Sequence, residues 1–153
     1  MYQKQLRRVE RWFDRLASIN QGRTHDRSTD YYSDEVYAFF LNCYHLKDWI
    51  INDGSVNLSN KKKLVEDLVT NDKHLSVCAD ICNSLKHLKL NSPPRSGAQP
   101  QFAQTHYALN LGGPETTISV KYTVDTAYGS VDAFDLGTEC LNAWRQFINK
   151  YKL

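Results

Sequence analysis

The spacing of apolar residues changes near residue 92 from a helical period to a strand period, and this change constrains the fold more than any other feature. Before it, apolar residues recur every three or four positions, as in amphipathic helices. Between residues 117 and 125, apolar and polar residues alternate instead, as in a strand with one buried face. The segment between them contains Pro93, Pro94 and Pro100, and proline cannot continue a helix because it lacks the amide donor. The sequence therefore predicts an α+β fold that is mainly α.

Four helices are predicted before the proline-rich segment. The first spans Tyr2 to Ile19, and the second spans Tyr31 to about Asn52. A third helix follows with Ser59 as its N-cap, and a fourth runs from His74 to Leu90. The second helix is apolar around most of its circumference, so we expect it to lie at the centre with neighbours on several sides.

Strand patterns and a last helix are predicted after the proline-rich segment. The strands are His106 to Leu111, Thr117 to Asp125 and Val131 to Leu136, separated by glycine-containing turns. Thr138 is a plausible N-cap for the closing helix, which carries an apolar stripe. Three consecutive strands with short turns are most simply arranged as an antiparallel meander.

A chain of 153 residues is close to the commonest domain size, so we predict a single domain over residues 1–153. It consists of a four-helix bundle (1–91), a proline-rich loop (92–104), and a three-stranded antiparallel meander with a C-terminal helix (105–153). No stretch approaches the roughly 20 apolar residues of a membrane-spanning helix, and the N-terminus leads into charge. We therefore expect a cytoplasmic protein with no membrane partner.

Four cysteines, Cys43, Cys78, Cys82 and Cys140, lie in apolar, helix-like segments, so we predict reduced core thiols. His74, Cys78 and Cys82 are spaced at i, i+4 and i+8, which could present three ligands to zinc. The same positions continue an apolar helix stripe, however, so the core interpretation is favoured. We predict no metal site and no cofactor.

The formal net charge of +2 is too small to indicate a nucleic-acid partner, because phosphate binding requires clustered cations. Two clusters are present: Lys61–Lys63, and the arginines near the first helix, which are Arg7, Arg8, Arg11, Arg15, Arg23 and Arg27. They could contact phosphates. A solvated, mixed-sign face is the favoured interpretation, since nearby acidic residues neutralise the field: Glu10, Asp14, Asp26 and Asp30.

The sequence contains no glycine-rich nucleotide loop, zinc-protease motif or serine-hydrolase motif, which argues against those classes. Its unusual feature is two polar stripes at helical spacing. They are Asn42, His45 and Asp48 on the second helix and Asp80, Asn83 and His87 on the fourth. If these helices pack side by side, both stripes could line one groove.

Such a groove could catalyse phosphodiester cleavage, with a histidine taking a proton from a nucleophilic hydroxyl. Lys86 and Lys89 flank His87 and could add positive charge. The alternative is that the stripes are solvated faces or a hydrogen-bond network that fixes the helix register. The spacing alone favours this structural alternative.

The segments Phe39–Ile50 and Ala79–Leu88 resemble the central helices of HEPN-type bundles, which occur in bacterial toxin–antitoxin and phage-defence systems. The resemblance covers about the first 90 residues. It implies a metal-independent, usually dimeric ribonuclease with an Arg, a polar residue directly after it, and a His four to six residues beyond the Arg. Asn83 and His87 match the polar residue and the His, but no Arg precedes them on the fourth helix.

Two hypotheses follow. In the first, the protein is a HEPN-like RNA-acting or RNA-binding protein, active or catalytically degenerate, with RNA, an antitoxin or other protein, and a second copy of itself as partners. Its catalytic residues would be His87, Asn83, His45 and Asp48, and its binding residues Asp80, Lys86, Lys89 and Asn42. In the second, it is a non-catalytic protein-interaction or oligomeric assembly module that uses an exposed β-edge and tyrosine-rich surfaces.

Overall fold

The computed structural model describes residues 1–87 and 92–153, and it confirms the predicted α+β fold. With 59% helix and 18% strand, the fold is mainly α, and the predicted order of bundle, antiparallel strands and final helix is confirmed. The elements are α1 (Tyr2–Gln21), β1 (Arg23–Thr24), α2 (Thr29–Asn52), α3 (Lys61–Asn71), α4 (Lys73–His87), β2 (Gln101–Asn110), β3 (Thr117–Thr126), β4 (Gly129–Asp132) and α5 (Ala133–Tyr151).

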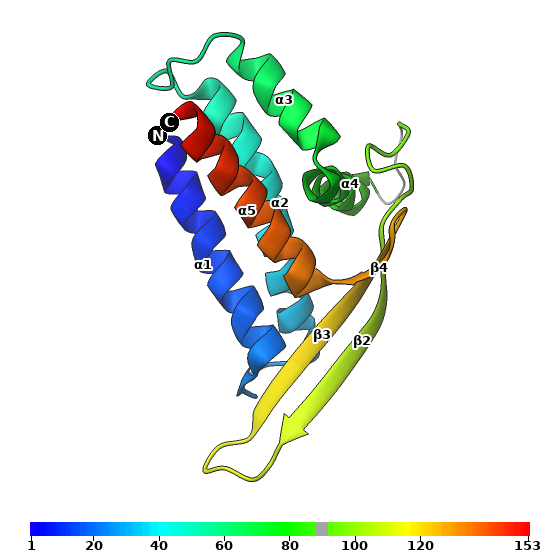
Figure 1. Cartoon of the computed structure of the whole chain (residues 1–153). Helices are drawn as coiled ribbons and strands as arrows, with labels where there is room; N and C mark the ends of the chain where they lie inside the picture. Colours follow the sequence, from blue (N-terminus) through cyan, green and yellow to red (C-terminus); the bar gives the residue numbers. More distant parts are fainter. Residues whose placement is uncertain (88–91) are drawn as a thin grey trace.

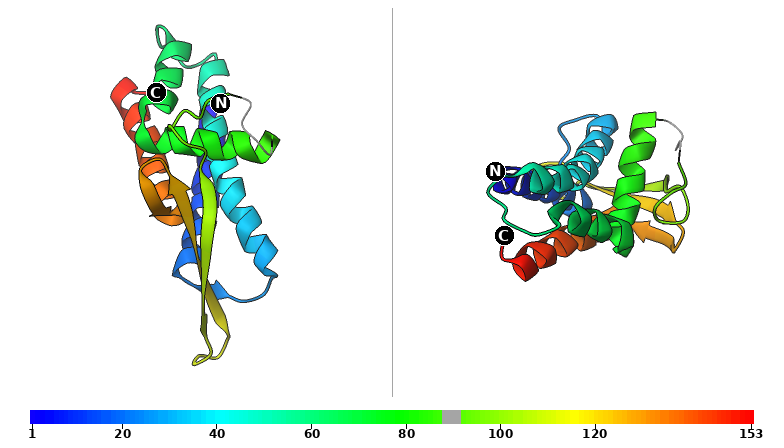
Figure 2. Two further views of the ribbon diagram at one scale, coloured as in Figure 1. Left: turned by 90° about the vertical axis from the view of Figure 1, so that its right-hand side faces the viewer. Right: turned by 90° about the horizontal axis from the view of Figure 1, so that it is seen from above.

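Three long helices, α1, α2 and α5, lie side by side, with α1 running opposite to the other two (Figure 1). Helix α4 crosses them near one end, as the two further views show (Figure 2). The apolar α2 contacts α1, α3, α4 and α5, which confirms its central position. Although α2 is so apolar, no helix among the described residues is long and apolar enough to cross a membrane.

Close packing of α5 against α1 and α2 forms the middle of the core. Trp144 of α5 is fully buried, and its indole Nε1–H donates to the carbonyl oxygen of Cys43 at 3.1 Å. One turn from the start of α5, Gly137 permits the close approach. A β-carbon there would lie 2.8 Å from Cε1 of Phe39 and 2.9 Å from Cδ2 of Leu16, so this position has no room for a side chain.

The sheet is organised around β3, which pairs antiparallel with β1, β2 and β4. The inner face of β3, which packs on α1 and α5, carries the predicted alternating residues Ile118, Val120, Tyr122 and Val124, all of them buried. The hairpin of β2 and β3 extends beyond the helices (Figure 1). In the described part of the chain, the outer edge of β2 has no pairing strand.

The predicted boundary between the last strand and the last helix is wrong. Strand β4 ends at Asp132, and helix α5 begins at Ala133 rather than after Thr138. The Asp132 carboxylate accepts the backbone N–H groups of Phe134 at 2.7 Å and Asp135 at 3.3 Å, so it is the N-cap. The Thr138 hydroxyl instead donates to the Phe134 carbonyl oxygen inside the helix.

Other boundaries also differ from the prediction. Arg23–Thr24, predicted as loop, forms the short strand β1, and β2 begins at Gln101, so the proline-rich loop is shorter than predicted. Asn60, with a left-handed φ of 55°, directly precedes α3 in place of the predicted cap Ser59. The last three residues of the predicted fourth helix, up to Leu90, lie outside the described residues.

Candidate nucleic-acid interface

The polar stripe predicted on α2 faces α1 and solvent. The Asn42 Oδ1 accepts a hydrogen bond from Nε2 of Gln5 in α1 at 3.2 Å, and the Asn42 carbonyl oxygen accepts from the same nitrogen at 2.9 Å. His45, one turn further on, is exposed. Asp48 forms an ion pair with the neighbouring Lys47 at 2.8 Å. None of these contacts involves α4.

The stripe predicted on α4 is used differently. Asp80 is buried, and its Oδ1 accepts the backbone N–H of Arg95 at 3.0 Å. Its Oδ2 accepts the backbone N–H and the hydroxyl of Ser96, both at 2.7 Å. The carboxylate therefore holds the proline-rich loop against α4. The predicted groove shared by Asn42 and Asp80 is wrong, because each side chain is bonded to a different neighbouring segment.

The remaining predicted site residues have no assigned role in the structure. Asn83 is half-buried on α4, and Lys86 is exposed one turn further on. The side chain of His87 and the whole of Lys89 lie outside the described residues. Catalysis by His87, Asn83, His45 and Asp48 therefore stays a prediction.

A row of cations runs along the outer face of α1. Lys4, Arg8, Arg11 and Arg15 follow one another at steps of four, three and four residues, and all four are exposed. At 100° per residue this spacing keeps them on one face of the helix. From Lys4 to Arg15 the row is about 16 Å long, roughly half the length of α1.

Tryptophan rings lie beside this row. The guanidinium of Arg8 lies 5.8 Å from the ring centre of Trp49, and that of Arg15 lies 4.8 Å from the ring centre of Trp12. Trp49 belongs to α2 and is 36% exposed, so part of its ring is accessible. We define the Arg–Trp face as the four cations of the row together with Trp12 and Trp49.

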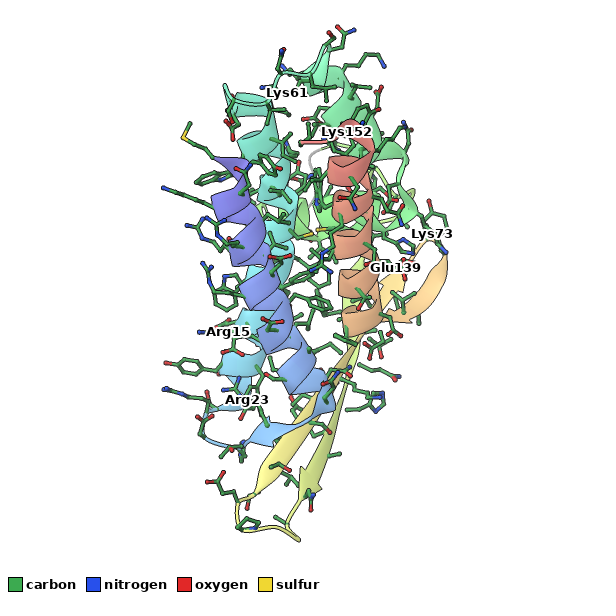
Figure 3. The ribbon with its side chains drawn as sticks, turned by 60° about the vertical axis from the view of Figure 1, so that its left-hand side comes forward. Arg15, Arg23, Lys61, Lys73, Glu139 and Lys152 are labelled. Carbon is green, nitrogen blue, oxygen red and sulfur yellow. The ribbon has the colours of Figure 1, made fainter. Side chains whose placement is uncertain are left out.

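A groove extends the Arg–Trp face toward the start of α2. It has a volume of about 850 Å³, and its charged lining consists of three arginines and three carboxylates: Arg15, Arg23, Arg27, Asp26, Asp34 and Glu35. Trp12 and Tyr31 also line it. Arg27 lies 5.3 Å from the ring centre of Tyr31, which repeats the arginine–aromatic pairing. Figure 3 shows Arg15 on this side of the molecule, away from Lys61 and Lys152 at one end of the bundle.

Two of the acidic residues near the row are paired, whereas Asp14 and Asp34 are exposed and form no ion pair within the described residues. Glu10 pairs with Arg145 of α5 at 2.9 Å. The Glu35 carboxylate forms ion pairs with the guanidinium groups of Arg23, at 2.9 Å, and Arg15, at 3.3 Å. In the described structure no ion pair forms at Lys4, Arg8 or Arg11. These three cations are therefore available to an anionic ligand.

A separate ionic network joins α2, α3 and the proline-rich loop. Lys47 pairs with Glu66 at 3.1 Å, and Arg95 approaches the other Glu66 oxygen at 3.5 Å. Burial lowers the pKa of Lys47, but hydrogen bonds to Asp48 and Glu66 outweigh this and raise it above its ordinary value. Burial raises the pKa of the adjacent Tyr44, with Arg95 and Lys47 opposing the shift. The charges of two cations and two carboxylates are balanced here, so the network connects α2, α3 and the proline-rich loop and leaves no net charge for a ligand.

The four cysteines are free and buried, which confirms the prediction of core thiols. Burial, reinforced by the neighbouring thiols of Cys43 and Cys78, raises the pKa of Cys140 well above its ordinary value. Cys78 donates to the carbonyl oxygen of Phe40 at 3.4 Å. Over residues 1–87 and 92–153, no group of three or more His, Cys, Asp or Glu residues is arranged to hold a metal ion, so His74, Cys78 and Cys82 form no such group.

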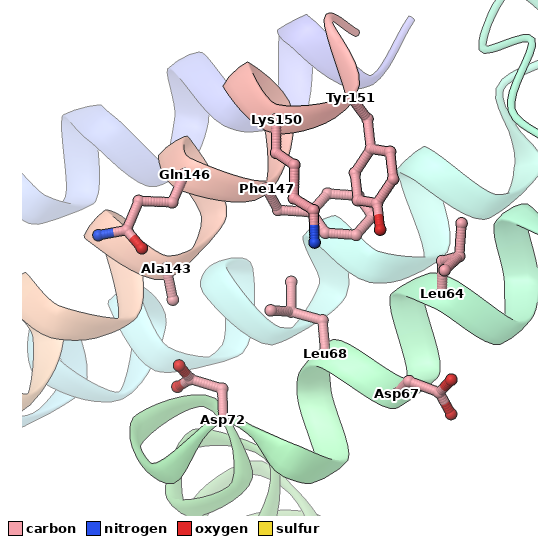
Figure 4. Close-up of a pocket in the computed structure, with 9 residues that line it drawn as sticks. All are labelled: Leu64, Asp67, Leu68, Asp72, Ala143, Gln146, Phe147, Lys150 and Tyr151. Carbon is pink, nitrogen blue, oxygen red and sulfur yellow. The ribbon is translucent and has the colours of Figure 1, made fainter.

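A cavity of about 340 Å³ lies between α3 and α5 (Figure 4). Its apolar lining includes Leu68 and Phe147. The carboxylates at its rim have structural partners: Asp67 pairs with Lys63, and Asp72 accepts the first backbone N–H groups of α4. Gln146 and Lys150 also line the cavity, and the Lys150 ammonium lies 5.2 Å from the ring centre of Tyr151.

Comparisons with known proteins identify no relative: no family model matches the chain, and no curated protein or solved structure resembles it significantly.

Proposed function

We propose that the protein binds single-stranded RNA on the Arg–Trp face. The observation that carries the proposal is the row of four exposed cations, two of which stack on tryptophan rings. Proteins that bind single strands combine backbone-tracking positive charge with aromatic rings on which unpaired bases stack. Lys4, Arg8 and Arg11 would contact phosphates, and the exposed ring of Trp49 would stack on a base.

The proposal agrees with the resemblance of α2 and α4 to RNA-acting HEPN-type bundles, but it places the RNA on the α1 side of α2. His45 lies on that side, one turn from Trp49, and would contact the bound strand. We propose binding without hydrolysis, because α4 lacks the arginine of active members.

Replacing both Arg8 and Arg11 with alanine is expected to weaken binding of a fluorescein-labelled oligouridine by about tenfold or more in low salt. The plot of log affinity against log salt should also become shallower by about 1.4, since each phosphate contact on a single strand contributes about 0.7 to the slope. Fluorescence anisotropy at several salt concentrations measures both quantities. Binding is measured well below the thermal midpoint, which should fall somewhat because Arg8 Nη1 also donates to Oε1 of the buried Gln5 at 2.6 Å.

The matched control is the double replacement of Lys62 and Lys121 with alanine, which removes the same charge from exposed positions outside the Arg–Trp face. Equal weakening by the two double variants would mean that binding follows net charge, and the proposed face would be wrong. Cleavage of the oligonucleotide that disappears on replacing His87 with alanine would contradict binding without hydrolysis.

A second function, self-association, is favoured by the free edge of β2. This strand has ten residues, one unpaired edge and no Lys, Arg, Asp or Glu. Exposed edges are usually protected by charge or proline, and this one is not. Tyr107 is 52% exposed and Leu109 is 58% exposed, so apolar side chains accompany the open backbone. We propose that the β2 strands of two copies of the chain pair antiparallel. Two identical strands that carry no Lys, Arg, Asp or Glu do not repel each other electrostatically.

Replacing Ala108 with lysine is expected to convert such a dimer into a monomer. Ala108 is exposed and pairs with Ser119 of β3, so a lysine would put a charge on the proposed dimer edge, as in protected edge strands, without entering the core. Light scattering during size-exclusion chromatography measures the mass. Glu115→Lys, in the exposed β2–β3 turn, is the control and should stay dimeric. A monomeric parent chain at high micromolar concentration would contradict self-association.

A further inference from the structure

A pocket of about 190 Å³ lies between the first half of α2 and the inner faces of β2 and β3. Its aromatic lining consists of Tyr37, Phe102, Tyr107 and Tyr122, and its smaller polar residues are Thr29, Asp30, Ser33 and Thr105. The rings are packed against one another: Tyr37 and Phe102 meet edge to face with centres 4.9 Å apart. The pocket shares no residue with the Arg–Trp face.

One polar group in this pocket lacks the partner that its burial requires. Tyr122 is 8% exposed, and its hydroxyl oxygen is covered and has no hydrogen-bond partner among the described residues. Buried hydroxyl groups are nearly always bonded, because leaving one unsatisfied is destabilising. The unsatisfied Tyr122 hydroxyl, on a residue that lines the pocket, indicates that a ligand group completes it.

The charge of the pocket indicates the kind of ligand. Among the described residues that line the pocket, Asp30 is the one that carries a charge. Burial raises the pKa of Tyr122 and of Tyr37, with smaller contributions from neighbouring tyrosines and from Asp30 and Asp34. These hydroxyls therefore stay protonated at neutral pH, so their oxygens can accept hydrogen bonds while the rings present electron-rich faces.

We propose that this pocket binds an organic cation, an alkylammonium or alkylguanidinium group. An N–H of the cation donates to the Tyr122 hydroxyl oxygen once the side chains that cover this atom move aside, and the exposed Asp30 carboxylate is its counter-ion. Tyr37 and Tyr107 supply the cation–π contacts. This site is independent of RNA binding, since none of its residues lies on the Arg–Trp face.

The test is a titration of the ¹⁵N-labelled full chain with n-butylammonium chloride, followed through backbone amide shifts at constant ionic strength. Saturable shifts are expected at Ser33, Tyr37, Thr105 and Tyr107, with an affinity on the order of millimolar for so small a ligand. Neutral n-butanol and anionic butyrate, which have similar chain lengths, should bind at least about fivefold more weakly.

Asp30→Asn and Tyr122→Phe are each expected to weaken butylammonium binding about fivefold or more. The Tyr122→Phe variant should melt at the same or a higher temperature, because the hydroxyl it loses has no partner. Asp26→Asn, in the same segment but outside the pocket, is the matched control and should bind like the parent chain. Equal binding of n-butanol, tighter binding of butyrate, shifts away from the pocket, or unchanged affinity of both pocket variants would overturn the proposal.

Discussion

Gly137→Val is expected to destabilise the protein by about 1–3 kcal/mol. The new β-carbon would lie 2.8 Å from a ring carbon of Phe39, closer than real side chains approach, and 2.9 Å from a methyl group of Leu16. Phe39 is fully buried and cannot swing into solvent, so α5 must move away from α1 and α2. The midpoint of urea denaturation should fall with little change in its slope.

Gly54→Val is the matched control, because a β-carbon at Gly54 meets nothing within 4 Å and its backbone is not left-handed. We expect a change within about 0.5 kcal/mol there. Similar losses at both positions would mean that the close approach of α5 does not determine stability, and the described core packing would be wrong.

Asp80→Ala is expected to cost about 2–4 kcal/mol and to release the proline-rich loop. The change leaves the backbone N–H groups of Arg95 and Ser96 without their acceptor, while the Ser96 hydroxyl keeps the carbonyl oxygen of Ala98 at 3.1 Å. Hydrogen exchange at the amides of these two residues should increase strongly, because opening the loop no longer breaks these bonds.

Asn83→Ala, one turn along α4, separates this structural role from a general effect on the helix. Asn83 is half-buried and makes no hydrogen bond within the described structure, so its replacement should change stability by less than about 0.5 kcal/mol. Equal exchange protection of Ser96 in Asp80→Ala and the parent chain would contradict the assigned role of Asp80.

Most helices and the buried face of β3 could be predicted because periodicity reports directly which residues share a face. Periodicity does not show which other segment of the chain a given helix or strand face contacts. Asn42 and Asp80 were correctly placed on helix stripes, yet one bonds to Gln5 of α1 and the other to the loop at Ser96. Strand β1 was missed for a related reason, since its two residues are strand only through pairing with β3.

The cation row of the Arg–Trp face is visible in the sequence as helical spacing, but a count of positive and negative residues does not show it. The prediction balanced the arginines of the first helix against Glu10 and Asp14 as one group. Helical angles separate Glu10 from the face that Arg8 and Arg11 share, whereas Asp14, three residues after Arg11, lies at the edge of that face. The pairing of Glu10 with Arg145, far away along the chain, could not be predicted from spacing.

The indole N–H signals of the three tryptophans test the proposed RNA face most directly. Trp12 and Trp49 belong to it, whereas Trp144 is fully buried with its indole N–H bonded to Cys43, and therefore serves as an internal reference. On adding a short oligouridine to ¹⁵N-labelled protein, we predict that the Trp12 and Trp49 signals shift progressively and saturate while the Trp144 signal stays in place. Saturable binding that leaves the Trp12 and Trp49 signals unmoved, or no binding in low salt, would contradict the account.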